Sequence, residues 1–312
     1  MSRIHEALKK AEQERAASQA TQPQPAFVPP DAPDSLLAEA VSAPIAPPLS
    51  SAPYASAMPA FASPFSIDAL LARSAQLEWR PDAKVMLFLN GDDNARGTEE
   101  FRTLRSRLYH TREKMTLKKI LVTSALPKEG KSFTSANLAQ VLVRQHGRRV
   151  LLIDGDLRAP RLHTMLGTTS APGLANYLQG SADEFSIMQR GPMENLFFIP
   201  SGEQISDAAE LVANGKLKIL LQRVEPLFDW IIIDSPPAVP VSDASILAKV
   251  CDGVVMVVRS NTTPVDLARR AREEFPDEAL VGVVLNGTDN DTSPYSRYYY
   301  NAYVRNQGEP RS

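Results

Sequence analysis

Cysteine is almost missing from this chain, because Cys251 is the only one among 312 residues. The sequence therefore excludes an internal disulfide and a cysteine-based metal cluster, and we expect Cys251 to be a small buried hydrophobe. The four histidines show no spacing typical of metal ligands. The formal net charge is only −2, so no overall basic field favours nucleic acid as a partner.

Long apolar runs are missing as well. The first 20 residues lack the apolar core of a signal peptide, and no run reaches the roughly 20 residues of a membrane span. We therefore expect the protein to stay in the cytoplasm. Residues 1–20 are predicted to contain a short helix, with Ile4, Leu8 and Ala11 on one stripe. This thin stripe leaves three roles open: an exposed helix, a docking helix or a membrane-surface helix.

Glycine does not occur before Gly91, and the chain changes character well before that point. Residues 21–66 contain eleven prolines and eleven alanines, a composition typical of an extended, disordered linker. Residues 67–97 are predicted to be a transitional segment, with a short helix over 67–77 and an apolar run over 85–89. The folded domain is predicted to span residues 98–290, and a C-terminal tail follows over 291–312.

Strands and helices alternate strictly within the predicted domain. Apolar runs of four to seven residues, each followed by a helical pattern, are typical of a parallel sheet covered on both faces. The predicted fold class is therefore α/β, with a doubly wound, mostly parallel sheet. The predicted strands are 118–124, 148–156, 196–202, 229–235, 252–258 and 280–286. The predicted helices after the one near residue 100 are 132–146, 174–178, 208–224, 242–250 and 264–275.

The first of these strands runs into the sequence Ala-Leu-Pro-Lys-Glu-Gly-Lys-Ser (125–132). This is the Walker A pattern of phosphate-binding loops, with alanine in place of the first glycine. Successive backbone N–H groups and a helix N-terminus form a cradle for anions, and Gly130 lets the backbone close around the phosphates. Lys131 would place a positive charge on the phosphate oxygens, and the Ser132 hydroxyl can bind Mg²⁺.

Carboxylates follow two other predicted strands. Asp154 and Asp156 come after Leu-Leu-Ile, and Asp234 comes after Trp-Ile-Ile-Ile. In open α/β sheets ligands bind outside the carboxyl ends of the strands, so we expect all three acids to face the phosphate loop. A Mg·ATP site needs oxygen ligands for the metal, and transfer of a phosphoryl group to a hydroxyl needs a carboxylate that accepts the proton.

These motifs together resemble the bacterial tyrosine kinases of capsule and exopolysaccharide synthesis, of the cytoplasmic CpsD/CapB type. ALPKEGKS is similar to the family's Walker A motif, LLIDGDLR to its Walker A′ motif and WIIIDSPP to its Walker B motif. The segment from Arg158 to His163 is similar to the family's sequence after Walker A′. The resemblance covers about two thirds of the chain and implies a P-loop fold that uses ATP and Mg²⁺.

The resemblance also implies roles for individual residues. Lys131 would bind the β- and γ-phosphates, Asp154 would be the catalytic base, and Asp234 would organise the water around the metal. Ser132 and Asp156 would hold Mg²⁺, although the roles of the two Walker A′ aspartates could be exchanged. Lys128 replaces a glycine common in the family, which leaves the fine geometry of the loop open. The implied ATP-binding residues are Lys128, Glu129, Gly130, Lys131, Ser132, Phe133 and Asn286, the last near the adenine.

The resemblance extends to assembly and partners. Glu99, Arg102 and Arg105 fit the family's E-x-x-R-x-x-R oligomerisation helix, which implies a ring-like homo-oligomer. Kinases of this type usually need a separate membrane-spanning activator from the polysaccharide export machinery, so we expect one here and localisation close to the inner membrane through it. A cognate tyrosine phosphatase is a further expected partner.

Five of the eight tyrosines lie in the last 18 residues, where no apolar periodicity supports a core role. By the resemblance they are the phosphoacceptors of an autokinase that acts between subunits. Several phosphates there would add about −1.5 to −2 charges each and could separate the subunits again. Base stacking and partner docking are the alternatives for such an aromatic segment. The tyrosines are Tyr295, Tyr298, Tyr299, Tyr300 and Tyr303.

Two other functions compete with the kinase hypothesis. One is an ATP-dependent switch of the MinD/ParA partitioning type, and the other is an adaptor of a polysaccharide export complex without kinase activity. Partitioning ATPases carry a signature lysine five residues before the Walker lysine, and this chain has Leu126 there. The intact set of phosphate-loop and aspartate residues argues against a silent adaptor.

Overall fold

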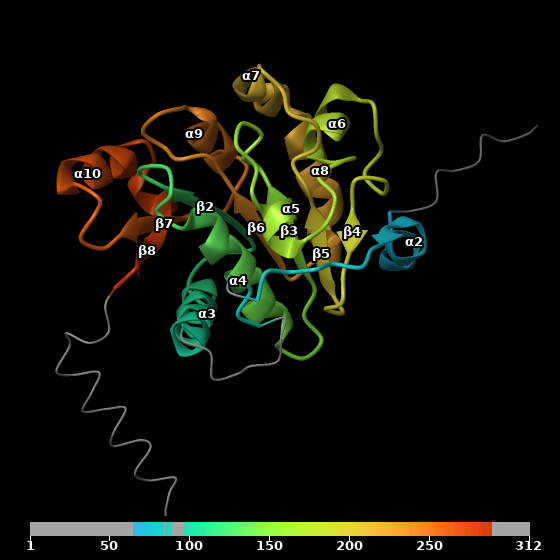
Figure 1. Ribbon diagram of the computed structural model, residues 1–312, viewed down its shortest axis with the longest axis horizontal. Helices are drawn as coiled ribbons and strands as arrows, with labels where there is room; N and C mark the ends of the chain where they lie inside the picture. Colours follow the sequence, from blue (N-terminus) through green and yellow to red (C-terminus); the bar gives the residue numbers. More distant parts are fainter. Residues whose placement is uncertain (1–64, 84, 89–96, 289–312) are drawn as a thin grey trace, which may run out of the picture. The chain divides into compact units, whose positions relative to one another are not determined.

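Residues 65–83, 85–88 and 97–288 are described by the structure, a computed structural model (Figure 1). They fall within one of the chain's two compact units, Ala57–Ser312. The predicted N-terminal helix, almost all of the Pro/Ala-rich linker and the tyrosine tail lie outside the described residues. Among the residues that are described, no helix combines the length and the apolar character that crossing a bilayer requires.

Eight strands of the described segments form one sheet in the order β1-β4-β5-β3-β6-β2-β7-β8. Only the pair β4–β5 is antiparallel, so the predicted α/β class with a mostly parallel sheet is confirmed. The central strands are buried along almost their whole length, as expected for a sheet covered on both faces. The strands are β1 (Ala75–Gln76), β2 (Lys119–Ser124), β3 (Val150–Asp154), β4 (Gln189–Arg190), β5 (Leu196–Ile199), β6 (Trp230–Asp234), β7 (Gly253–Arg259) and β8 (Leu280–Asn286).

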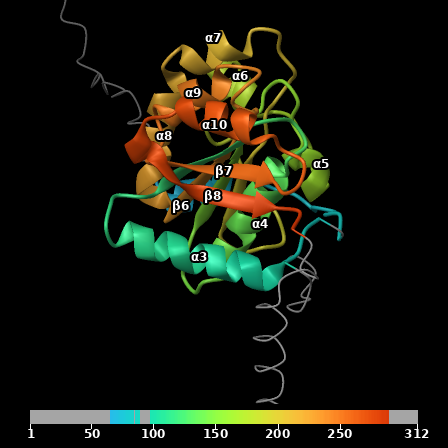
Figure 2. The ribbon, with the colours of Figure 1, turned by 90° about the vertical axis from the view of Figure 1, so that its left-hand side faces the viewer.

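Helices cover both faces of this sheet. Alternate residues of β6 show the two layers, because Ile231 and Ile233 join one apolar cluster while Trp230 and Ile232 join the other. Figure 2 shows α3 and α4 on one side of β7 and β8, and α9 and α10 on the other. The helices are α2 (Ile67–Arg73), α3 (Thr98–Arg112), α4 (Lys131–Val143), α5 (Leu162–Leu166), α6 (Leu174–Gln179), α7 (Ala208–Ala213), α8 (Lys216–Val224), α9 (Asp243–Ala248) and α10 (Val265–Glu273). Two short 3₁₀ turns are Glu225–Leu227 and Asp277–Ala279.

Two predicted helices were wrong in extent. The helix predicted over 67–77 ends at Arg73, because Ser74 adopts an extended conformation and the next two residues pair with β4 as strand β1. The helix predicted over 208–224 is two helices. Gly215 takes a left-handed φ of 82° between them, and the side chain of Asn214 accepts a hydrogen bond from the Lys216 backbone at 2.9 Å. An Asn-Gly pair therefore breaks the helix despite a continuous apolar pattern.

Candidate active site

The loop between β2 and α4, residues 125–130, is called the phosphate loop below. It ends at Gly130, which caps α4 with a φ of 99° and has no side chain that could occupy the first N–H groups of the helix. No acidic residue stands in the first turn of α4, so the helix dipole favours an anion there. Figure 1 shows α4 passing along the middle of the sheet, where it contacts β2, β3 and β6.

Lys131, the first residue of α4, is buried, and its Nζ lies 2.9 Å from Oδ2 of Asp156. Burial by itself lowers the pKa of Lys131. The negative charges of Asp234, Asp156 and Asp154 outweigh burial, so the pKa is raised above its ordinary value. The lysine is therefore held as a cation where the phosphate loop opens.

Asp154 ends β3 and is completely buried, with 0% of its surface exposed. Its two carboxylate oxygens accept backbone hydrogen bonds from Asp156 at 3.3 Å and from Leu162 at 3.2 Å. Burial raises the pKa of Asp154 well above its ordinary value, and the charges of Asp234 and Asp156 raise it further. Asp154 is thus a carboxylate with unusually high affinity for a proton.

Asp234 ends β6 and lies directly opposite Asp154 in the sheet register. Its Oδ1 accepts a hydrogen bond from the Ser135 hydroxyl at 3.1 Å, whereas its buried Oδ2 has no hydrogen-bond partner within the described residues. Burial raises the pKa of Asp234, and the positive charge of Lys131 and the Ser132 hydroxyl oppose that rise. Three buried carboxylates therefore share one lysine, which leaves an excess of negative charge.

That excess suits a divalent cation. The unpartnered oxygen of Asp234 and the nearby Ser132 hydroxyl suit Mg²⁺, which binds protein oxygens directly or through its bound water. In the described segments no group of three or more acidic, histidine or cysteine side chains is placed to hold a metal by itself. Magnesium needs only one or two protein oxygens, because it completes its shell with water and substrate phosphates.

Three other predicted ATP-binding residues have contacts within the protein. Lys128 is exposed, and its backbone carbonyl accepts a hydrogen bond from Arg259 at 3.1 Å. The ring of Phe133 packs on Phe101, with 5.8 Å between the ring centroids. Asn286 donates from Nδ2 to the backbone carbonyl of Glu129 at 2.9 Å, so its amide contacts the phosphate loop itself. Their predicted contacts with ATP stay predictions.

The predicted oligomerisation residues all lie on α3, but they do not share one environment. Glu99 and Arg102 form an ion pair within the helix. Arg105 donates from Nη1 to the backbone carbonyl of Val141 at 3.1 Å, on α4 of the same chain. Arg105 therefore also ties α3 to the helix that carries Lys131.

Sequence patterns missed several residues that shape the site. Ser135, one helical turn after Lys131, binds Asp234. Arg158 forms a two-pronged ion pair with the buried Asp243 of α9, with N···O distances of 2.7 and 3.0 Å, and so fixes the segment after Asp156. Arg158 could have been identified from its position in the Walker A′ motif, whereas no sequence pattern pointed to Asp243.

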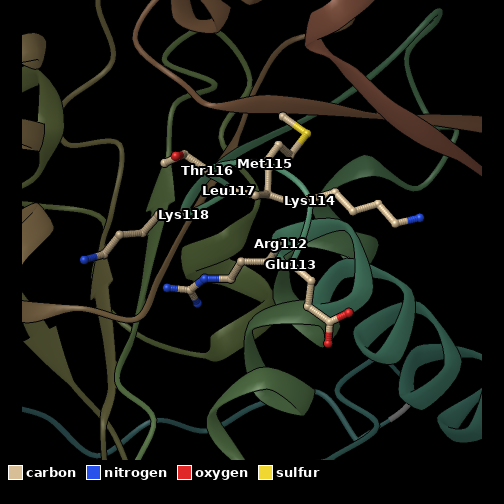
Figure 3. Close-up of a pocket in the computed structure, with 7 residues that line it drawn as sticks. All are labelled: Arg112, Glu113, Lys114, Met115, Thr116, Leu117 and Lys118. Atoms are coloured by element: carbon tan, nitrogen blue, oxygen red, sulfur yellow. The ribbon is translucent and has the colours of Figure 1, made fainter.

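A surface hollow of about 470 Å³ lies at residues 112–118, at the amino end of β2. The phosphate loop follows the opposite, carboxyl end of that strand. Figure 3 shows the side chains of Lys114 and Lys118 extending to opposite sides of the hollow. Its cations do not converge on one point, so it is no candidate for the phosphate site.

The family model described as an AAA domain matches residues 118–266, which include the phosphate loop and all three aspartates. Tyrosine-protein kinase YwqD of Bacillus subtilis (strain 168) is 35% identical over 205 residues, 65% of this chain and 85% of that protein. Tyrosine-protein kinase CpsD of Streptococcus agalactiae is 33% identical over 208 residues, 65% of this chain and 90% of that protein. The chain belongs to the bacterial tyrosine kinase family.

Solved structures agree with this family. The kinase domain of the Escherichia coli tyrosine kinase ETK superposes with a TM-score of 0.60 at 28% identity, covering 69% of this chain and 85% of that chain. The chimerical protein CapA2B2 gives a TM-score of 0.61 at 26% identity and covers 70% of this chain and 96% of that one. The resemblance predicted from the sequence is confirmed, and the chain is a protein-tyrosine kinase with a nucleotide-binding phosphate loop.

Replacing Lys128 by glycine should stabilise this kinase slightly. Lys128 adopts a left-handed φ of 67°, which costs a residue with a Cβ about 1–2 kcal/mol, against a glycine entropy penalty of about 0.5–1 kcal/mol. We expect Lys128→Gly to raise the melting temperature by about 1–2 °C. Lys249, which is also exposed but has a φ of −63°, is the matched control. Lys249→Gly should lower the melting temperature, and equal shifts in the two variants would contradict the strain at Lys128.

Proposed function

We propose that this chain is a Mg·ATP-dependent autokinase that phosphorylates its tyrosine tail between subunits and thereby regulates exopolysaccharide synthesis and export. The observation that carries the proposal is the arrangement of Lys131 among three buried carboxylates at the mouth of the phosphate loop. Family membership supports the tyrosine chemistry. The crowding of five tyrosines into the last 18 residues supports the tail as acceptor.

Each residue at the site has a proposed task. Lys131 binds the β- and γ-phosphates, and Ser132 and Asp156 would hold the magnesium ion, which would neutralise charge on the phosphates. Asp234, with its free buried oxygen, would order the water around that ion. Asp154 accepts the proton of the tyrosine hydroxyl, and its raised pKa supports this role because a more basic carboxylate takes a proton more readily.

The proposed assembly is a ring of identical subunits, with a membrane-spanning activator of the polysaccharide machinery as partner. Its support is the E-x-x-R-x-x-R pattern on α3 and the resemblance to kinases that work with such an activator. A cognate tyrosine phosphatase would reverse the modification. We place the protein in the cytoplasm, at the membrane through its activator.

Mapping phosphotyrosine by mass spectrometry after incubation of the full chain with Mg·ATP tests the acceptor. The incubation is run with and without the cytoplasmic segment of the candidate activator. We expect label in the tail, at one or more of Tyr295, Tyr298, Tyr299, Tyr300 and Tyr303. A variant with all five changed to phenylalanine should keep ATP hydrolysis and lose the label. A wild-type chain that hydrolyses ATP without labelling the tail would favour the partitioning-type switch.

Mixing two variants, neither of which can label its own tail, tests transfer between subunits. The five-phenylalanine chain keeps the active site but has no tail acceptor, and Lys131→Met keeps the acceptors but lacks the active-site lysine. Label on the tail of the Lys131→Met chain in the mixture is the expected result. A mixture without label, when wild type alone is labelled, would mean that transfer occurs within one subunit.

A further inference from the structure

The phosphate loop is held from outside by the turn after β7 and by the end of β8. Arg259, the last residue of β7, donates from Nη1 to the backbone carbonyl of Lys128 at 3.1 Å. Thr263, in the following turn, donates its hydroxyl to Oε1 of Glu129. Asn286, the last residue of β8, donates from Nδ2 to the backbone carbonyl of Glu129 at 2.9 Å. Elements more than 130 residues away thus hold two successive residues of the loop.

Glu129 is the centre of these contacts. It is only 3% exposed, and its Oε2 accepts a hydrogen bond from the Leu126 backbone at 2.7 Å. Both carboxylate oxygens are therefore used within the protein, one on the start of the loop and one on Thr263. A side chain directed at phosphate or metal would instead present an oxygen to the opening of the loop.

The hydroxyl of Thr263 has a defined direction. It accepts a hydrogen bond from the Arg259 backbone at 3.1 Å, so its own hydrogen is free to point at Glu129. The contact therefore needs an acceptor on the Glu129 side. The turn after β7, Glu129 and Leu126 form one continuous chain of hydrogen bonds.

Such support has a physical reason. A phosphate cradle collects several backbone N–H groups around one point, and these dipoles repel one another until an anion arrives. The backbone at Lys128 adds to this cost, since a residue with a Cβ has a φ of 67° there, whereas the φ of 99° two residues later is tolerated by Gly130. A Cβ at residue 130 would lie 2.0 Å from Nδ2 of Asn286, so the brace also requires glycine there. External hydrogen bonds can hold the loop in this conformation before nucleotide binds.

We propose that Glu129, Thr263 and Asn286 are positioning residues that brace the phosphate loop, and that none of the three contacts the nucleotide. The inference rests on the proposed ATP site and goes beyond it, because it replaces the ligand roles predicted for Glu129 and Asn286. The brace lowers the cost of forming the cradle, so its loss should weaken nucleotide binding more than it slows phosphoryl transfer once ATP is bound.

Paired variants of Thr263 and Glu129 test the brace in the full-length chain. Thr263→Val keeps the shape but removes the hydroxyl, leaving a buried carboxylate oxygen unpaired, whereas Thr263→Ser keeps the hydrogen bond. We expect Thr263→Val to weaken Mg·ATP binding about tenfold by calorimetry, equal to about 1.4 kcal/mol. Its KM for ATP should rise with kcat within about twofold, and Thr263→Ser should match wild type. Equal affinities in the valine and serine variants would overturn the brace.

Two variants of Glu129 distinguish a role through hydrogen bonds from a role through negative charge. Glu129→Gln can still accept from the Leu126 backbone but turns an NH2 group towards Thr263, so it should bind Mg·ATP about as weakly as Thr263→Val and better than Glu129→Ala, which loses both contacts. If the carboxylate instead acts through its charge on metal or phosphate, glutamine will be as poor as alanine, and the proposal fails. Wild-type protein that binds no Mg·ATP at all would refute the proposed function itself. Wild-type protein that binds Mg·ATP, with variants that bind it equally well, would refute only the brace.

A variant of Asn286 distinguishes a bracing role from a contact with the adenine. Inorganic tripolyphosphate carries the phosphates of ATP without the base, and its affinity can be measured by competition against a fluorescent ATP analogue. If Asn286 braces the loop, Asn286→Ala should weaken the binding of tripolyphosphate and of ATP by the same factor. A loss confined to ATP would overturn the assignment of Asn286 to the brace and restore its predicted place at the adenine.

Discussion

Replacing Lys131 by methionine should abolish phosphotyrosine formation and also destabilise the folded protein at neutral pH. Methionine keeps the length of the side chain but leaves Asp154, Asp156 and Asp234 buried without a cation. Removing one partner of a buried ion pair typically costs about 3–5 kcal/mol of the free energy of unfolding. Urea unfolding at pH 7.5 measures this loss, and phosphotyrosine blotting measures the activity.

The destabilisation of Lys131→Met should shrink as the pH falls. Asp154 and Asp234 have raised pKa values, so the folded state binds more protons than the unfolded state between the ordinary and the raised values. In that window the free energy of unfolding rises as pH falls. Without the lysine charge these pKa values rise further, so the variant gains more than wild type on acidification. The raised pKa of Lys131 itself acts only at alkaline pH, where its stabilisation is lost on deprotonation.

An exposed lysine provides the control for this prediction. Lys114→Met removes a charge from the surface, where single substitutions usually change the free energy of unfolding by less than about 0.5 kcal/mol. Lys131→Met must therefore be the much less stable variant at pH 7.5, and the gap must narrow at pH 5. Equal stability of the two variants at pH 7.5 would contradict the electrostatic account of the site.

The sequence predicted the parts of this site that depend on where the strands end. Apolar runs identified β2, β3 and β6, and an acid after each of the latter two had to lie at the carboxyl edge of the sheet, beside the phosphate loop. The sequence did not predict that β3 and β6 are neighbours or that Asp154 pairs with Asp234 in register, and only the structure supplied both.

Side-chain direction is what the sequence could not supply. Glu129 and Phe133 both stand in or next to a phosphate-binding motif, so both were predicted as ligand contacts, yet one bonds within the loop and the other packs on Phe101. Thr263 lies 134 residues from Glu129 in the chain. Only the folded sheet, which places β7 beside β2, brings that hydroxyl to the loop.

Helix ends show the same limit at a local level. The apolar pattern of 208–224 is continuous, but the Asn-Gly pair within it favours a left-handed turn over helix propagation. At residues 74–76 a helical pattern loses to pairing with a distant strand, β4, that the sequence did not reveal. Backbone preference therefore ended the helix at the Asn-Gly pair, whereas tertiary contacts ended it at residues 74–76.

Replacing Asp234 by asparagine should abolish kinase activity and, in contrast to Lys131→Met, stabilise the folded protein at neutral pH. The change removes one of three buried negative charges, and the asparagine oxygen can still accept the Ser135 hydroxyl. We expect the free energy of unfolding at pH 7.5 to rise by on the order of 1 kcal/mol, the usual trade between stability and activity at a strained site. Urea unfolding and phosphotyrosine mapping on the same preparation measure both effects.

The pH dependence separates this stabilisation from a general effect of asparagine. Burial raises the pKa of Asp234 in the folded state. The buried charge therefore lowers the stability of the wild-type protein only at pH values at which the carboxylate would ionise. The gain in Asp234→Asn should thus be largest above the raised pKa and disappear as the pH falls towards the ordinary aspartate value. Asp207→Asn, at the exposed N-cap of α7, should change stability little, because the Asp207 side chain makes no capping hydrogen bond to the helix. An Asp234→Asn protein less stable than wild type at pH 7.5 would mean that the buried charge is matched after all. Lys131→Met is expected to lower stability and Asp234→Asn to raise it. If both variants were less stable than wild type, the site would not hold the excess negative charge that suits a bound cation.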